Sequence, residues 1–239
     1  MANNRQHTDD SYLHVSNLKL SYPLTDGKRL TVLDIDKFTI DRGSSVGLMG
    51  PSGSGKTSFL YSISGIERPQ EGEIRWGDVM LNKLSPIEID RWRQRNIGFV
   101  FQDFHLIPRH TPLENVLLPV YFQHMRPTEQ IKSHAQYLLN RVGISNSNVS
   151  VERLSRGEKQ RVATARALLM SPPIILADEP TASIDRETAE AVMELLLSLS
   201  VETGATLFVV SHDPAIMNHL SQVYSLSGGR LIKEEDTNV

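Results

Sequence analysis

One stretch of the sequence has the residue types and the spacing needed to hold a row of phosphates. It reads Gly-Pro-Ser-Gly-Ser-Gly-Lys-Thr over positions 50–57, which fits the pattern G-x-x-x-x-G-K-[ST] at every fixed position. Glycines let the backbone curl so that successive N–H groups point at one anion, and the helix expected to follow adds its positive dipole end. We expect Lys56 to contact the β- and γ-phosphates of a nucleotide and Thr57 to offer its hydroxyl to Mg²⁺. The residues predicted to bind the nucleotide in and next to this phosphate loop are Gly50, Ser52, Gly53, Ser54, Gly55, Lys56, Thr57 and Ser58.

An acidic pair follows an apolar segment later in the chain. Ile174–Ala177 is typical of a buried strand, and Asp178 and Glu179 come directly after it. Because ligands of open α/β sheets bind at the carboxyl ends of the strands, this pair can face the phosphate loop. We expect Asp178 to hold Mg²⁺ through water and Glu179 to polarise an attacking water as a general base. Taken alone, such a pair more often begins a solvated loop, and its place downstream of a phosphate loop favours function.

Two further strand candidates end in polar side chains. Ile97–Phe101 is followed by Gln102, and Leu207–Val210 is followed, after one serine, by His212. If both strands join the parallel sheet, these side chains reach the edge that carries the phosphate loop. Gln102 would bind Mg²⁺ or the attacking water through its carbonyl oxygen, and a neutral His212 would donate to the γ-phosphate. Each residue in isolation is better explained as a structural amide or an ordinary strand-end histidine, and the shared edge favours function. The expected catalytic residues are therefore Glu179, His212, Lys56 and Gln102, and the expected Mg²⁺ ligands are Thr57, Gln102 and Asp178.

The elements that must position these residues alternate between strands and helices. Helix candidates over Thr57–Gly65 and Arg186–Ser200 separate apolar strand candidates, and this alternation predicts a parallel α/β sheet. Short strands at Leu13–Val15, Leu18–Tyr22 and Phe38–Ile40 predict a small antiparallel sheet ahead of it. The strands expected in the parallel sheet are Ser45–Met49, Ile97–Phe101, Ile174–Ala177, Thr206–Val210 and Val223–Leu226.

The stretch over residues 103–170 differs in character and predicts a helical subdomain. Tyr121–Val142 and Lys159–Leu169 are helical in composition, and prolines punctuate the first half of the stretch. We expect a single domain over residues 11–239. Within it, residues 11–102 and 171–239 would form the core with its antiparallel β subdomain, and residues 103–170 the helical subdomain. Residues 1–10 are expected to be a flexible N-terminus.

Composition narrows the class of protein. The chain has 239 residues, a formal net charge of −3 and no cysteine, which excludes disulfides, thiolate metal sites and cysteine nucleophiles. The N-terminus lacks the apolar segment of a signal peptide, and no apolar run approaches the ~20 residues of a membrane-spanning helix. The weak negative charge argues against nucleic acid as a partner, because nucleic-acid-binding proteins normally carry a basic patch.

A third motif, Leu-Ser-Arg-Gly-Glu over residues 154–158, opens a helix candidate. It resembles the signature of the ABC ATPases, usually written L-S-G-G-Q or L-S-G-G-E. The phosphate loop, Gln102, this signature, the acidic pair, Asp185 and His212 follow one another in the order of that family. The chain is therefore similar to ABC ATPases over nearly its whole length. The resemblance implies the P-loop NTPase fold of the family, an α/β fold with a parallel-sheet core, and an ATPase that uses ATP and Mg²⁺.

Several roles are implied by this resemblance alone. Two copies of such a domain close head to tail around two ATP molecules, and the signature of one chain contacts the γ-phosphate bound by the other. That contact would come from the hydroxyl of Ser155 and the N–H of Gly157 at a helix N-terminus. Asp185 lies in the loop that crosses the dimer interface in the family, and Tyr22 matches the aromatic residue that stacks on adenine. A surface tyrosine on a strand explains Tyr22 nearly as well.

Arg156 departs from the family pattern, because it stands where the first signature glycine is usual. A cation near the γ-phosphate of the partner chain could add attraction, and a bulky side chain could equally obstruct close approach of the backbone. The sequence leaves the sign of this effect open. Because Ser155 and Gly157 are retained, we expect the site still to close.

The segment around Gln102 resembles one bacterial branch of the family. That branch supplies the ATP-binding subunits of lipoprotein-releasing and macrolide-export machines and the related cell-division ATPase. The resemblance implies an integral membrane, permease-like partner whose coupling helix would dock on Asp103–Gln123. It also implies a peripheral location at the cytoplasmic face of the bacterial inner membrane. The segments that carry it are Ile97–Gln102, Leu106–Pro108 and Thr111–Pro119.

Two alternatives stay open at this level. The same ATPase could serve a non-transporting complex of envelope signalling or cell division, because specificity lies in the partner. A DNA-maintenance ABC ATPase is more remote. Such proteins insert long coiled coils between the phosphate loop and the signature, and this interval holds no sustained heptads.

Overall fold

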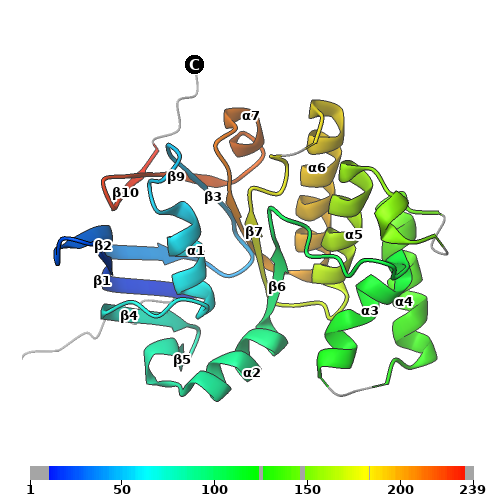
Figure 1. The fold of residues 1–239 in the computed structure, drawn as a ribbon, viewed down its shortest axis with the longest axis horizontal. Coiled ribbons are helices and arrows are strands. Elements are labelled where there is room, and N and C mark those ends of the chain that lie inside the picture. Colours follow the sequence, from blue (N-terminus) through cyan, green and yellow to red (C-terminus); the bar gives the residue numbers. More distant parts are fainter. Residues whose placement is uncertain (1–10, 124–125, 146–148, 183, 235–239) are drawn as a thin grey trace, which may run out of the picture.

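Parallel strands form the centre of the molecule (Figure 1). The computed structural model describes residues 11–123, 126–145, 149–182 and 184–234, so the N-terminus expected to be flexible lies outside the described residues. The main sheet has the order β10-β9-β3-β8-β7-β6, and all neighbours except β10 and β9 run parallel. Its strands are β3 (Ser45–Met49), β6 (Ile97–Val100), β7 (Ile174–Asp178), β8 (Thr206–Val210), β9 (Gln222–Ser227) and β10 (Arg230–Lys233).

Both faces of the central strands β7 and β8 are buried, which explains why these two strands are almost entirely apolar. Along β7, Ile174 and Leu176 face one hydrophobic core, and Ile175 and Ala177 face the other. The first core lies between the main sheet and the antiparallel sheet and includes Phe59 of α1 (Lys56–Ser64). The helices that lie between residues 112 and 203 cover the second core. The expected α/β fold with a parallel and an antiparallel sheet is confirmed.

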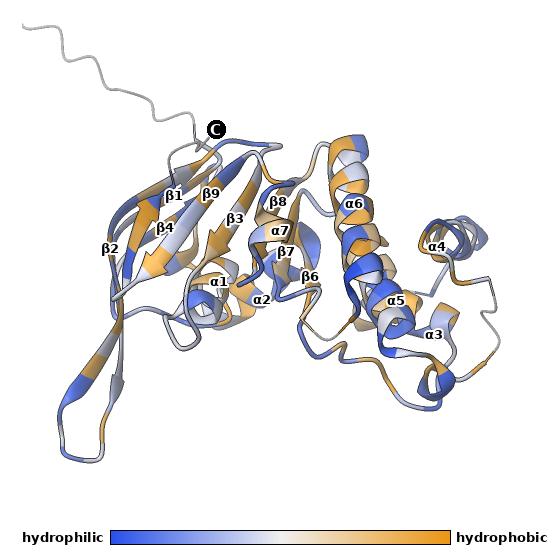
Figure 2. Ribbon diagram, turned by 90° about the horizontal axis from the view of Figure 1, so that it is seen from above, coloured by the Kyte–Doolittle hydropathy of each residue, from blue (hydrophilic) through white to orange (hydrophobic). Residues whose placement is uncertain are grey.

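The antiparallel sheet has the order β2-β1-β4-β5. The short strands expected between Leu13 and Ile40 are wrong in length, because β1 and β2 are two long strands joined in one hairpin that projects from the body (Figure 2). β1 continues through a local irregularity: its pairing with β4 shifts register between Ser16 and Lys19, and Asn17 in that interval has a φ of +49°. The strands are β1 (Leu13–Pro23), β2 (Arg29–Ile40), β4 (Glu71–Trp76) and β5 (Val79–Met80).

The helical stretch is divided into separate helices. The stretch Tyr121–Val142, expected to be helical in composition, contains the end of α3 at Phe122 and all of α4, which begins at Glu129. Pro127 lies in the gap, and a proline disfavours helical backbone in the residue before it. The further helices are α2 (Pro86–Asn96), α3 (Pro112–Phe122), α4 (Glu129–Arg141), α5 (Arg156–Leu168), α6 (Arg186–Thr203) and α7 (Pro214–Met217), with 3₁₀ turns at Leu81–Lys83 and Val151–Arg153.

The grouping of α3, α4 and α5 is visible in Figure 1, where they lie together at one side of the main sheet. Their core also includes Val100 of β6 and Met193 of α6. The subdomain boundary at residues 102 and 103 stays a prediction. In the described part of the chain, no helix is both long and apolar enough to cross a bilayer.

Candidate functional site

The register of the parallel strands brings the predicted residues to one edge of the sheet. Val100 of β6 pairs with Ala177 of β7, so Gln102 and Glu179 each follow two residues beyond a paired position. Ala177 also pairs with β8, which delivers His212 to the same edge. β3 lies next to β8 and runs into the phosphate loop. Side chains that lie far apart in the sequence therefore converge because their strands end at the same level.

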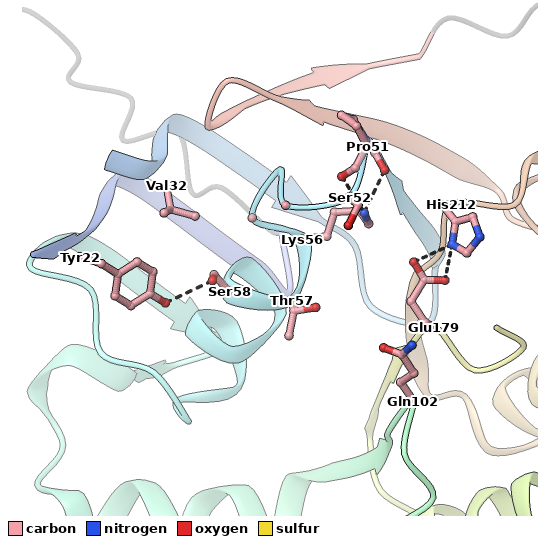
Figure 3. A pocket seen from close by; sticks show the side chains of 13 residues that line it. Tyr22, Val32, Pro51, Ser52, Lys56, Thr57, Ser58, Gln102, Glu179 and His212 are labelled. Atoms are coloured by element: carbon pink, nitrogen blue, oxygen red, sulfur yellow. Dashed lines mark hydrogen bonds and ion pairs between the residues drawn. The ribbon is translucent and has the colours of Figure 1, made fainter. Parts of the chain in front are cut away.

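A cavity of about 610 Å³ opens at this edge (Figure 3). Most of the predicted nucleotide-binding residues line it, together with three of the predicted catalytic groups that come from other strands. The lining residues are Tyr22, Val32, Gly50, Pro51, Ser52, Gly53, Gly55, Lys56, Thr57, Ser58, Gln102, Glu179 and His212. Of the predicted phosphate-loop residues, Ser54 is absent from this lining, because its hydroxyl is buried beneath the loop surface.

The phosphate loop has a conformation that only glycine allows at two positions. Gly55 caps α1 with a φ of +102°, and a Cβ there would lie 2.8 Å from the Cγ1 atom of Val32. Gly50 has a φ of +151°, and a Cβ there would lie 2.5 Å from the carbonyl oxygen of Leu226. Both the backbone angle and the surrounding space therefore exclude a side chain, as a loop that wraps an anion requires.

Lys56 is almost fully buried, with 8% of its surface exposed. Its Nζ donates to the carbonyl oxygens of Gly50 at 2.8 Å and of Pro51 at 3.1 Å. These contacts hold the ammonium across the loop, at the wall of the cavity. The buried hydroxyl of Ser54 has no hydrogen-bond partner among the described residues. A buried cation at the wall of a glycine cradle fits a phosphate group, which accepts several hydrogen bonds.

The two groups expected to hold Mg²⁺ lie side by side. The Thr57 hydroxyl donates to Asp178 Oδ1 at 3.2 Å, and Asp178 is 4% exposed. Burial raises the pKa of Asp178, the hydrogen bond from Thr57 opposes that rise, Glu179 adds to it, and Lys56 opposes it. A hydroxyl and a carboxylate are hard oxygen donors of the kind that Mg²⁺ prefers. Within the described ranges no group of three or more histidines, aspartates or glutamates could hold a metal alone. The pair therefore fits an ion that takes its other ligands from phosphate and water.

Asp178→Asn is expected to stabilise the nucleotide-free chain while abolishing its Mg²⁺-dependent activity. A carboxyl whose pKa is raised by folding binds more protons when folded, so its ionisation lowers stability as the pH rises through the unfolded and then the folded pKa. Asparagine can still accept from Thr57 and carries no charge. Thermal unfolding near neutral pH should show a higher midpoint, by roughly 2–4 °C per kcal/mol gained. The difference should vanish below the unfolded pKa, and a lower midpoint at neutral pH would contradict the assignment of a costly buried charge.

Glu179 and His212 form a pair at the lip of the cavity. His212 Nδ1 lies 2.9 Å and 3.0 Å from the two carboxylate oxygens of Glu179. Glu179 has a φ of +45°, and its N–H donates to the carbonyl oxygen of Val210 at 2.8 Å. The left-handed backbone turns the Glu179 side chain out of the β7 line towards His212, as Figure 3 shows. The carboxylate is 12% exposed and the imidazole 65% exposed, so the pair meets both the cavity and solvent.

Tyr22 is held at the far side of the cavity by residues that the sequence motifs did not indicate. Its hydroxyl donates to Glu67 Oε1 and lies 3.2 Å from the Ser58 hydroxyl. Val32 of β2 lines the same wall. Neither Glu67 nor Val32 belongs to a motif, and no signal in the sequence places them near the phosphate loop.

Ser155, Gly157 and Asp185 do not line this cavity, which belongs to a single chain. Ser155 caps α5 through a reciprocal pair of hydrogen bonds with Glu158: its Oγ accepts from the Glu158 N–H at 3.2 Å, and its own N–H donates to Oε2 at 2.8 Å. Asp185 caps α6 without this reciprocity: its carboxylate accepts from the N–H of Thr188 at 3.0 Å. Both caps fix the first turn of a helix.

Arg156, the departure from the signature pattern, is exposed and lies over a ring. Its guanidinium carbon is 5.9 Å from the centre of the Phe104 ring, two residues beyond Gln102. An exposed cation–π contact contributes about 0.5–1 kcal/mol. We therefore expect Arg156→Gly to change steady-state ATP turnover by less than about fivefold, measured by phosphate release. A change of orders of magnitude would show that this side chain controls closure of the site.

Comparison with known proteins agrees with this geometry. A family model described as ABC transporter matches residues 33–182, which is more than half of the chain. The chain belongs to this family of ATP-binding, ATP-hydrolysing proteins. The expectations of an ATPase and of ATP and Mg²⁺ as its ligands are confirmed at the level of the family.

Individual relatives are similar over almost the whole chain. The lipoprotein-releasing system ATP-binding protein LolD of Idiomarina loihiensis is 39% identical over 228 residues, which cover 95% of this chain and 99% of the relative. The protein MJ0796 of Methanocaldococcus jannaschii is 41% identical over 200 residues. A solved dimeric structure of MJ0796, in a post-hydrolysis state with ADP and Pi, matches with a TM-score of 0.86 at 36% identity. That match covers 95% of this chain and 100% of the other.

Proposed function

We propose that this chain hydrolyses ATP in a head-to-tail dimer and thereby drives a membrane partner of the lipoprotein-releasing type. The observation that carries the proposal is the convergence of Lys56, Glu179 and His212 on one cavity although they come from three separate elements. A dimeric relative with ADP and Pi supports the dimer, and relatives of the LolD type support the membrane partner. The same relatives support a peripheral place at the cytoplasmic face of a bacterial inner membrane.

Each residue of the cavity then has a separate role. Lys56 and the N–H groups of the phosphate loop bind the β- and γ-phosphates, and Tyr22 stacks on the adenine. Glu179 accepts a proton from the attacking water, and His212 donates to the γ-phosphate and orients the Glu179 carboxylate through their hydrogen bonds. Bound through Thr57, Asp178 and Gln102, Mg²⁺ would neutralise phosphate charge.

Closure of the dimer supplies the remaining contacts. The Ser155 hydroxyl and the Gly157 N–H of the partner copy would meet the γ-phosphate, and Asp185 would cross the interface. These contacts exist only while the γ-phosphate is present, so ATP favours the closed dimer and hydrolysis favours the open one. Preorganised positioning and electrostatics account for most of the rate in this kind of phosphoryl transfer.

An apolar groove of about 460 Å³ lies beside the Gln102 segment and is the surface we assign to the membrane partner. Phe101, His105 and Ile107 line one wall, and Leu118 and Phe122 of α3 line another. Phe122 is 63% exposed, which is unusual for a large apolar side chain. Part of the groove lining, including His105, Ile107 and Phe122, belongs to the predicted docking segment Asp103–Gln123.

The groove is tied to the nucleotide site through α5. Arg166 donates to the carbonyl oxygens of Phe104 at 2.7 Å and His105 at 2.6 Å. α5 also begins at the signature. A displacement at the groove would therefore move the signature through this one rigid helix. This arrangement would let movement of the membrane partner follow nucleotide-driven closure.

The test of the proposed function is a pull-down of the tagged Glu179→Gln chain from detergent-solubilised membranes of the source cell, with ATP and Mg²⁺. Mass spectrometry should identify an integral membrane protein in stoichiometric amount. The extracytoplasmic domain of that membrane protein would then indicate whether the complex releases lipoproteins or transmits a signal. Recovery of soluble proteins or DNA alone would contradict a membrane partner.

Phe122→Glu should abolish this recovery while leaving the ATP turnover of the isolated chain within about twofold, because the residue lies outside the nucleotide cavity. Burying an unpaired carboxylate against an apolar helix is strongly unfavourable. Val201→Glu is the matched control, since Val201 is also apolar, exposed and near the end of a helix, and it does not line the groove. Equal recovery with both variants would exclude the groove as the docking surface.

A further inference from the structure

Gly157 is a glycine at a position where the backbone does not demand one. It is the second residue of α5, within the right-handed helix, where alanine is normally more favourable than glycine. The space beside it gives the reason. A Cβ at position 157 would lie 2.8 Å from the Cγ2 atom of Thr188, closer than packed carbon atoms approach. Thr188 lies in the first turn of α6, and Figures 1 and 2 both show α5 and α6 side by side.

The other side of Thr188 is bonded to the loop that precedes α6. The N–H of Thr188 donates to Asp185 Oδ1 at 3.0 Å, and its hydroxyl donates to Oδ2 at 2.8 Å. These two hydrogen bonds lower the pKa of Asp185, and the charge of Arg161 on α5 lowers it further. One threonine therefore touches the start of the signature helix with its methyl group and holds the Asp185 carboxylate with its hydroxyl.

We propose that Thr188 is a positioning residue that holds the signature and Asp185 at a fixed spacing, and that contact with its methyl group requires glycine at position 157. The inference rests on the proposed function, in which both elements reach the partner copy. Two surfaces that must meet one partner at the same time bind best when their spacing is set beforehand. The phosphate contact of the Gly157 N–H needs no glycine, since every residue except proline carries an N–H.

The test is a rescue experiment on the Glu179→Gln chain, which retains ATP. Size-exclusion chromatography measures the ATP concentration that gives half-maximal dimer. Gly157→Ala should raise this concentration roughly tenfold or more, because the added methyl group forces α5 away from α6. Thr188→Ser removes the Cγ2 atom and keeps the hydroxyl, so the Gly157→Ala/Thr188→Ser double variant should return to within about threefold of the parent. If the double variant stays as impaired as Gly157→Ala, the glycine requirement lies at the phosphate and the proposal is overturned.

A second variant separates positioning from folding. Thr188→Val keeps the methyl contact with Gly157 and removes the hydroxyl bond to Asp185. It should raise the half-maximal ATP concentration about two- to tenfold, with ATP binding to the monomer unchanged. Thr203→Val, the same change at the far end of α6, is the matched control and should stay within about twofold of the parent. Equal effects of Thr188→Val and Thr203→Val would overturn the positioning role.

Failure of the proposed function gives a different result. A parent chain that forms no ATP-dependent dimer would contradict the head-to-tail dimer itself, and with it the positioning role. Thermal unfolding without nucleotide would still test the contact between the Thr188 methyl group and position 157. Gly157→Ala should lower the midpoint of unfolding, and adding Thr188→Ser should restore it. An unchanged midpoint in Gly157→Ala would show that the methyl contact is absent.

Discussion

Replacing Glu179 by glutamine is expected to lower steady-state ATP turnover by roughly 10²–10⁴-fold, the usual contribution of a general base. Glutamine keeps the shape of the side chain and can still accept from His212, so the cavity should retain its form. It cannot take a proton from water. ATP should therefore bind and stay intact, and the chain should accumulate as an ATP-bound dimer.

Two measurements check this result together. Phosphate release gives the turnover, and size-exclusion chromatography with ATP and Mg²⁺ gives the dimer. Glu194→Gln is the matched control, because Glu194 is an exposed glutamate on α6 outside the cavity. Turnover close to that of the unmodified chain would mean that another group activates the water, and a monomer in the presence of ATP would count against the closed dimer.

Lys56→Ala is expected to have the second large effect, and it acts at an earlier step. Charge-assisted hydrogen bonds contribute about 1.5–3 kcal/mol each, so losing the ammonium should weaken ATP binding by roughly 10–100-fold. Turnover should fall further, because the same charge meets the γ-phosphate as its charge changes during transfer. The variant should also form no dimer at ATP concentrations that saturate the Glu179→Gln chain.

Binding is measured by titration with a fluorescent ATP analogue, and folding by thermal unfolding without nucleotide. Lys83→Ala removes an exposed lysine from the 3₁₀ turn after β5 and serves as the control. In the unmodified chain Lys56 bonds to the carbonyl oxygens of Gly50 and Pro51, so a small loss of stability is expected in the variant. Unchanged ATP affinity in a folded Lys56→Ala chain would exclude the phosphate role of this residue.

The sequence by itself determined the chemistry that we propose for the site, because that chemistry depends on local features. The phosphate loop is contiguous, and its glycines, lysine and threonine have their roles through backbone angles that adjacent residues set. The sequence placed Asp178, Glu179, Gln102 and His212 together because each lies at or just after the end of an apolar strand, and parallel strands present their carboxyl ends at one edge. The same pattern of strands and helices was enough to predict the class of fold.

The tertiary structure decided how these residues are held, because those contacts join segments that are distant in the sequence. Glu67 at the Tyr22 hydroxyl, Val32 beside Gly55 and Thr188 beside Gly157 carry no sequence signal, since each depends on how two elements pack. The long hairpin of β1 and β2 and the separate helix α2 were also missed. Of the α2 side chains, Ile89 is the buried one, so the helix lacks the apolar period that would reveal it.

Burial was equally a property of the fold. Only the packed structure shows that Asp178 is nearly inaccessible, and this burial raises its pKa and makes its ionised form costly before Mg²⁺ binds. Likewise, a sequence motif identified Gly157, but its neighbour Thr188 supplied the spatial reason for a glycine there. Motifs report which groups can react, and the packing of distant elements sets their distances, exposure and charge.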